Sequence, residues 1–205
     1  ATLDIDGSAL TLPQLRDYES ARPMVRLTDE ARRSMQASVD SVARAVTRGE
    51  VTYGINTGFG AFASKVIPAA QTRKLQLNLI RSHTCGSGAP LPAVIVRRML
   101  LLKANSLAAG FSGVRPLVAE MLLELLNADV LPVIPEQGSV GASGDLAPLA
   151  HLALALIGEG EATHDGAMLA NEAVLRAIGR DALEPAAKEG LALLNGTQLS
   201  LALAA

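Results

Sequence analysis

Residues 138–148 contain a tripeptide, Ala142-Ser143-Gly144, whose residue types allow it to react with itself. In a tight bend, the Gly144 amide nitrogen can attack the Ala142 carbonyl carbon, and loss of one water closes a five-membered ring. Loss of a second water, from the Ser143 side chain, leaves an exocyclic methylidene group, which is an electrophile. Glycine presents the least hindered backbone nitrogen, and alanine is small enough for a compressed turn. Such a bend is strained, so its surroundings must enforce it.

The same stretch does not fit three other glycine-rich motifs. It is not a P-loop, because no Gly-Lys-Ser/Thr follows to place a lysine on a phosphate. Its GxxGxxG spacing, with no clear strand before it, is not a dinucleotide-binding fingerprint. Asp145 stands where a G-x-S-x-G nucleophile elbow needs its second glycine, which disfavours a serine hydrolase built on Ser143. The simplest structural interpretation is a glycine-rich turn that caps a helix beginning near Asp145.

Residues 138–151 (GSVGASGDLAPLAH) resemble the signature of the aromatic amino acid ammonia-lyases. Residues 52–60 (TYGINTGFG) and 193–198 (LLNGTQ) resemble two other characteristic segments of this family, in the same order. In the family, the Ala-Ser-Gly tripeptide forms a methylidene-imidazolone group autocatalytically. The resemblance therefore implies a carbon-nitrogen lyase whose prosthetic group arises from Ala142, Ser143 and Gly144, with no external cofactor.

The resemblance also implies roles for three side chains. Tyr53 aligns with the tyrosine that removes the β-proton of the substrate, a role that needs positive or hydrogen-bonding groups nearby. Asn195 is implied to lie beside the prosthetic group, where it polarises the carbonyl of that group or holds the substrate carboxylate. Taken alone, Asn195-Gly196 is also a simple turn. Asp145 can act as an acid during cyclisation or cap its own helix, and both interpretations stay open.

Ser82-His83 bears on the choice of substrate. The resemblance associates a Ser-His pair at this position with members that act on histidine, and an apolar residue or His-Leu with those that act on phenylalanine or tyrosine. His83 can hydrogen-bond a substrate imidazole, which an apolar ring cannot reciprocate. The implied reaction is elimination of ammonia from L-histidine to give trans-urocanate. The alternatives are a phenylalanine or tyrosine ammonia-lyase or aminomutase, or a non-catalytic folded fragment of such an enzyme. Attack on the electrophile by the substrate amine or by its ring is left open.

The composition excludes several classes of protein. Hydrophobic residues make up 49% and charged residues 19%, the balance of a globular protein in water. A net charge of −2 gives no electrostatic case for binding nucleic acid or an anionic membrane. No apolar run is long enough to span a bilayer. The single cysteine excludes an internal disulfide framework, and three scattered histidines form no metal-ligand pattern. We expect a cytoplasmic enzyme with a small amino acid substrate and no metal.

The elements that must position these residues are predicted to be mainly α-helices with minor β-structure in short hairpins. Aromatic residues make up only 2%, so the core must be built from aliphatic residues, which favours closely packed helices. Residues 51–68, rich in glycine, are expected to form a loop that can close over substrate. Hairpin turns are predicted at Asp6-Gly7 and Asp165-Gly166. The periodicity predicts helices over residues 13–18, 28–48, 70–83, 93–108, 114–127, 145–156, 171–178 and from 186 onward.

Residues 1–205 are expected to form one domain, the N-terminal cofactor-forming domain of the ammonia-lyase fold, without the long C-terminal helical bundle. The helical pattern that begins near Ala186 continues to Ala205 with no Gly or Pro to end it, which predicts a truncated chain. The resemblance implies a homo-oligomer, a tetramer in full-length relatives. Apolar helix faces left uncovered are then expected to promote self-association.

Overall fold

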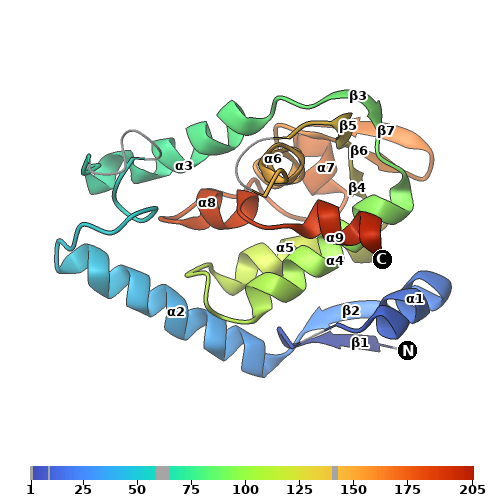
Figure 1. Ribbon diagram of the computed structural model, residues 1–205, viewed down its shortest axis with the longest axis horizontal. Helices are drawn as coiled ribbons and strands as arrows, with labels where there is room; N and C mark the ends of the chain where they lie inside the picture. Colours follow the sequence, from blue (N-terminus) through green and yellow to red (C-terminus); the bar gives the residue numbers. More distant parts are fainter. Residues whose placement is uncertain (1, 9, 59–64, 140–142) are drawn as a thin grey trace.

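The computed structural model describes residues 2–8, 10–58, 65–139 and 143–205, so Ala142 and Gly60 lie outside the described residues. Helices dominate the described chain, and the strands are short (Figure 1). This confirms the predicted class, mainly α with minor β. The helices are α1 (Leu12–Ala21), α2 (Asp29–Thr47), α3 (Ala69–His83), α4 (Ala93–Ala108), α5 (Pro116–Asn127), α6 (Leu146–Leu156), α7 (Glu172–Arg176), α8 (Glu189–Leu194) and α9 (Gln198–Ala204).

The core is one cluster of buried side chains, in which α4 packs on α5 and α9 while α6 packs on α8 and α9. Figure 1 shows α8 near the middle of the molecule, with α3 on one side and α4 and α5 on the other. Burying one leucine side chain contributes roughly 1.5–3 kcal/mol, so an aliphatic core can hold this fold with almost no aromatic residues. The fully buried side chains of the three central helices include Met99, Leu100, Leu101, Leu122, Leu125, Leu149, Leu152 and Leu156.

The chain begins with a parallel strand pair, not the predicted hairpin. Strand β1 (Thr2–Ile5) pairs with β2 (Met24–Leu27), and helix α1 forms the connection between them. The turn at Asp6 is present, since its Oδ1 accepts the Ser8 amide at 2.8 Å. The Gly7 amide, however, donates to Asn105 Oδ1 on α4 at 3.2 Å, which directs the chain away from β1. The sequence pattern therefore predicted the turn after β1, but it did not predict that β2 is the strand with which β1 pairs.

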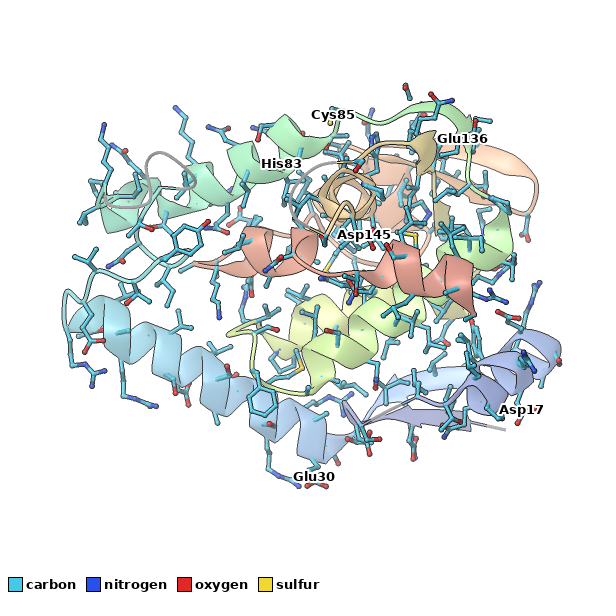
Figure 2. The ribbon with its side chains drawn as sticks, in the orientation of Figure 1. Asp17, Glu30, His83, Cys85, Glu136 and Asp145 are labelled. Atoms are coloured by element: carbon cyan, nitrogen blue, oxygen red, sulfur yellow. The ribbon has the colours of Figure 1, made fainter. Side chains whose placement is uncertain are left out.

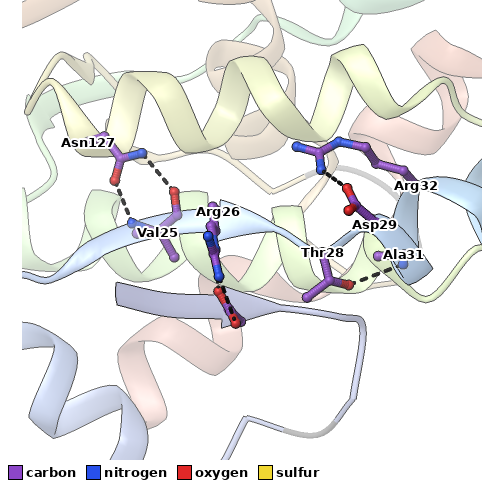
Figure 3. Close-up of polar contacts among 8 residues, drawn as sticks. Val25, Arg26, Thr28, Asp29, Ala31, Arg32 and Asn127 are labelled. Atoms are coloured by element: carbon purple, nitrogen blue, oxygen red, sulfur yellow. Dashed lines mark hydrogen bonds and ion pairs between the residues drawn. The ribbon is translucent and has the colours of Figure 1, made fainter. Parts of the chain in front are cut away.

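Two side chains fix β2 and the start of α2 (Figure 3). Asn127 binds both backbone groups of Val25, with its Oδ1 accepting the amide and its Nδ2 donating to the carbonyl, each at 2.8 Å. Its amide side chain therefore acts as a substitute strand partner and ties β2 to α5. Thr28 caps α2, because its Oγ1 accepts the Ala31 amide at 3.1 Å.

Two further small sheets surround α6. Strand β3 (Ser87–Pro90) pairs antiparallel with β5 (Pro135–Gln137), and β4 (Leu131–Pro132) pairs with β6 (Glu161–His164). Strand β7 (Ala167–Ala170) completes the predicted hairpin with β6. The strands β3 and β5 were not predicted, because proline and glycine disfavour strands in sequence patterns. Among the described residues, no helix is long and apolar enough to cross a membrane.

Candidate active site

Ser143 and Gly144 form a bend immediately before α6. Gly144 has φ +80°, a conformation that favours glycine, and a Cβ on this residue would lie 3.3 Å from Ser139 Oγ. Ser143 is half-buried, and its Oγ accepts the Asp145 amide at 3.3 Å. The described part of the tripeptide therefore has the tight turn and the unhindered glycine that cyclisation needs. Ala142, the remaining member, lies outside the described residues.

Asp145 does not cap its own helix, contrary to one of the two interpretations of the sequence. Its carboxylate makes no side-chain cap to α6. Instead Oδ2 accepts the Ser200 amide at 3.0 Å, and Oδ1 accepts the Ser200 hydroxyl at 2.7 Å. Ser200 lies in the first turn of α9, so Asp145 caps that helix from another part of the chain. Figure 2 shows Asp145 where α6 and α9 approach each other. Its role as an acid in cyclisation stays a prediction.

Asn195 lies at the break between α8 and α9. The predicted single helix from residue 186 divides here, because Asn195 takes an extended conformation with ψ 115° at the end of α8. Its amide donates to Leu191 O at 2.9 Å, while its side chain is exposed. The turn that Asn195-Gly196 allows is therefore a helix break that presents an amide side chain.

Lys103, which was not among the predicted site residues, contacts this break. Its Nζ donates to the Asn195 carbonyl oxygen at 3.1 Å, although its side chain arises from the middle of α4. Lys103 is only 1% exposed, and burial lowers its pKa to about 7. The signal in the sequence was a lone lysine within the apolar run of residues 99–104.

His83 and Ser82 lie at the end of α3. His83 Nδ1 is 2.8 Å from the Leu79 carbonyl oxygen and 3.1 Å from Ser82 Oγ. Because a carbonyl oxygen only accepts, Nδ1 carries the proton and donates to it. In the neutral ring the second nitrogen, Nε2, is then a hydrogen-bond acceptor. The local contacts of α3 thus select one tautomer of His83.

A cavity of about 560 Å³ adjoins His83. Most of its wall is apolar, including Val66, Ile67, Leu75 and Leu79, and Ser82, His83 and Gly58 complete the side nearest the loop. The described residues that line this cavity do not include Tyr53, Ser143, Gly144 or Asn195. The chain therefore places the predicted substrate-selecting pair in a pocket, but that pocket does not itself contain the other predicted residues.

Tyr53 lies in a turn of the loop that follows α2, and 55% of its surface is exposed. Gly54, with φ +78°, places the loop against α8, since a Cβ there would be only 2.5 Å from Leu191 Cδ2. The buried hydroxyl of Thr57 accepts the Gly54 amide at 3.3 Å and donates to the Gly58 carbonyl at 3.0 Å. Residues 54–58 are thus held together by Thr57 and packed on α8 at Gly54.

Helix α8 is the element that connects these groups. Leu191 contacts the Tyr53 loop at Gly54, and its amide donates to Gln76 Oε1 on α3 at 3.1 Å. Gln76 is fully buried on the same helix that carries His83. The end of α8 carries Asn195, and α6, which follows the tripeptide, also packs on α8. Helix α8 therefore contacts the loop at Gly54, helix α3 at Gln76 and helix α6, and it ends at Asn195.

The family model for aromatic amino acid lyases matches residues 10–205. The chain belongs to the aromatic amino acid lyase family. It is 49% identical over 201 residues to a histidine ammonia-lyase of Idiomarina loihiensis. That match covers 98% of this chain but only 39% of the relative, so the chain spans well under half of the relative's length.

Solved structures of related lyases and aminomutases have the same fold. A histidine ammonia-lyase from Trypanosoma cruzi matches with a TM-score of 0.88 at 40% identity, over 99% of this chain and 39% of that one. A tyrosine aminomutase from Streptomyces globisporus matches with a TM-score of 0.90 at 35% identity, over 99% of this chain and 38% of that one. Both reaction types share this lyase-family scaffold, so the fold alone does not separate them.

The residues present fit the prosthetic group that the lyase family implies. Gly144 has a left-handed conformation in which a Cβ would come within 3.3 Å of Ser139 Oγ, and Ser143 supplies a β-hydroxyl. Asp145 and Ser200 fasten the segment to α9. Ser200 and Gln76, like Lys103, were missed in the sequence, because their importance comes from contacts with distant residues. Within the described ranges, no group of three or more acidic, histidine or cysteine side chains could hold a metal ion.

Proposed function

We propose that this chain is the cofactor-forming N-terminal domain of a histidine ammonia-lyase that converts L-histidine to trans-urocanate and ammonia. The observation that carries the proposal is the bend at Ser143-Gly144, with Gly144 at φ +80° and the adjoining Asp145 clamped to Ser200. The supporting comparison is the 49% identity to a protein named histidine ammonia-lyase. Because the chain spans 39% of that relative, we assign the activity to a complete enzyme that includes it, a homotetramer as the family resemblance implies.

The chain's own residues would prepare the group as follows. Gly144 offers its backbone nitrogen to the Ala142 carbonyl carbon without hindrance from a Cβ, and one water leaves as the bond forms. The Ser143 hydroxyl leaves with an α-proton as the second water. The methylidene-imidazolone group supplies an electrophilic carbon that makes a bound substrate amine easier to expel. Asp145, held by Ser200, keeps the bend from relaxing into a regular turn of α6.

Tyr53 and Asn195 would act on the substrate from either side of α8. Tyr53 removes the β-proton, and its loop is anchored on Leu191 through Gly54. Asn195 offers an exposed amide that can bind the substrate carboxylate or the carbonyl of the prosthetic group. Gly54, next to Tyr53, packs on Leu191 of α8, and Asn195 caps the end of the same helix, so α8 would help to set the separation of the two side chains.

His83 supports histidine as the substrate. With Nδ1 donating to Leu79 O, its Nε2 can accept a hydrogen bond from an imidazole N–H. A phenylalanine ring cannot supply that donor, and it would leave Nε2 unpaired. A phenylalanine or tyrosine lyase or aminomutase is the second candidate, favoured by the matches to solved tyrosine and phenylalanine aminomutases and to a phenylalanine ammonia-lyase.

The test is turnover by the complete enzyme, followed through urocanate absorbance with histidine, phenylalanine and tyrosine as substrates. The proposal predicts urocanate from histidine and at most trace cinnamate or coumarate from the others. The matched control is Ser143→Ala, which keeps the turn but cannot lose a second water. Cinnamate or coumarate as the main product would instead support a phenylalanine or tyrosine enzyme of the same family. An active Ser143→Ala enzyme would contradict the role of the tripeptide.

A further inference from the structure

Lys103 is buried among aliphatic side chains. It lies in α4, where Met99, Leu100 and Leu107 are also buried, and only 1% of it is exposed. Among the described residues, no carboxylate forms an ion pair with it, and the contact found for its Nζ is the Asn195 carbonyl oxygen at 3.1 Å. Burying an amine without an acidic partner is costly. A leucine or methionine would fill the same space without that cost, so packing alone does not explain this lysine.

The contact falls at a point where α8 needs a partner. The last carbonyls of a helix lack intrahelical donors and carry partial negative charge. Helix α8 has no basic residue in its own last turn, and Asn195 is its C-cap. Lys103 supplies the missing donor from a different helix. Its amine thus meets the one backbone oxygen that belongs to the predicted active-site asparagine.

The break between α8 and α9 is held on both sides. Lys103 holds the carbonyl of Asn195 at the end of α8, and Asp145 holds the amide and hydroxyl of Ser200 in the first turn of α9. Asn195 is also fixed through its own amide, which donates to Leu191 O at 2.9 Å. The backbone of Asn195 is therefore constrained at both its N–H and its C=O, while its side chain is left exposed.

We propose that Lys103 is a positioning residue for Asn195: its amine fixes the Asn195 carbonyl and thereby orients the Asn195 side chain toward the reacting groups. The function of Asn195 in this proposal rests on the proposed lyase activity, whereas the contact between Lys103 and Asn195 does not. Lys103 itself touches neither substrate nor prosthetic group in this account. Its depressed pKa, about 7 through burial, agrees with an amine that has no acidic partner in the part of the chain that the structure describes.

The first experiment measures the break directly. Amide hydrogen exchange is followed by mass spectrometry over the peptide spanning residues 195–201, in the chain with Lys103→Met. Methionine has similar length and no donor, so the core stays filled. Exchange is expected to be faster on the order of tenfold, because one hydrogen bond that holds the break is lost. Lys74→Met, the same change at an exposed lysine on α3, is the control and is expected to leave exchange unchanged. Unchanged exchange in Lys103→Met would overturn the proposal.

The second experiment uses the complete enzyme and a double-mutant cycle. Lys103→Met is expected to lower kcat on the order of 10- to 100-fold, the usual effect of a small misplacement of an active-site group. In an Asn195→Ala background, the same substitution is expected to lower kcat less than twofold further, because the side chain that it positions is gone. A purely structural lysine would reduce kcat by the same factor in both backgrounds, which would contradict positioning.

A variant that keeps a donor separates this proposal from a failure to fold. Lys103→Gln retains an N–H donor on a side chain one bond shorter than lysine and is expected to recover part of the slow exchange and of kcat. If Lys103→Met does not fold, partly retained slow exchange and kcat in Lys103→Gln support the proposal, and loss of both overturns it. An enzyme with no activity on histidine would defeat the proposed function while the exchange result still decides whether Lys103 holds Asn195.

Discussion

Asp145 binds Ser200 through both carboxylate oxygens, with Oδ2 at 3.0 Å from the amide and Oδ1 at 2.7 Å from the hydroxyl. Fifty-five positions separate the two residues in sequence. One begins the helix after the reactive tripeptide, and the other lies in the first turn of the helix after the Asn195 break. The pair therefore couples the geometry of the predicted electrophile to that of the asparagine expected beside it.

Removing this pair should destabilise the protein in two steps. Asp145→Ala leaves the Ser200 amide without an acceptor and should lower the free energy of unfolding by about 3 kcal/mol. Ser200→Ala keeps the amide contact and should cost about 1.5 kcal/mol, the contribution of one hydrogen bond to a carboxylate. Urea unfolding measures both. Ser20→Ala removes a hydroxyl that donates only to its own exposed helix, and it should have little effect. Equal effects for all three variants would show that the pair does not fasten the two helices.

Substrate preference should depend on His83. In the complete enzyme, His83→Leu should lower kcat/KM for histidine about 100-fold and leave that for phenylalanine unchanged or raised, because the imidazole partner is lost and an apolar wall is gained. Steady-state kinetics with both substrates gives the ratio. His164→Leu, at a histidine of β6 outside the cavity near His83, is the control and should keep the histidine preference. If His164→Leu lost the preference for histidine, or if His83→Leu kept it, His83 would not be the residue that selects the substrate.

Stability should fall as the pH is lowered, in part through His151. Burial holds the pKa of His151 below its ordinary value of 6.5, and its Nε2 accepts the Gly86 amide at 3.1 Å, which requires the unprotonated nitrogen. The unfolded chain takes up this proton as the pH falls through 6.5, whereas the folded chain does so only at lower pH. The contribution is therefore complete above 6.5 and is lost as the pH falls toward the folded pKa.

The measurement is the free energy of unfolding in urea at about pH 7.5 and about pH 5.5, for the wild type and for His151→Gln. Glutamine keeps an acceptor near the position of Nε2 but does not titrate in this range. The wild type should lose more stability between the two pH values than the variant does. An equal loss of unfolding free energy in the wild type and in His151→Gln would show that protonation of His151 does not contribute to the pH dependence of stability.

Features built from neighbouring residues could be predicted from the sequence. The start of α2 at Thr28, the β6–β7 hairpin at Asp165-Gly166 and the turn at Asn195-Gly196 all follow from contacts within a few positions. Local patterns were sufficient here because caps, turns and breaks are decided by short-range hydrogen bonds.

Features decided by distant contacts could not be predicted in this way. The partner of β1 depends on Gly7 meeting Asn105, which lies 98 positions away. An aspartate before a helix normally predicts its own cap, but Ser200 captures the Asp145 carboxylate. A lysine within an apolar helix could have pointed outward, and only the fold shows that Lys103 is buried against Asn195. In each case the residue that makes the contact lies far away in the sequence, and hydrophobic periodicity does not predict which distant segments will pack together.

The intact mass of the complete enzyme, with peptide mapping across residues 142–144, tests the central claim most directly. The account predicts a mass lower by two water molecules, localised to the peptide that contains Ala142-Ser143-Gly144, and a Ser143→Ala enzyme that lacks this loss and does not turn over histidine. An enzyme that turns over histidine while this peptide has its full unmodified mass would contradict the account.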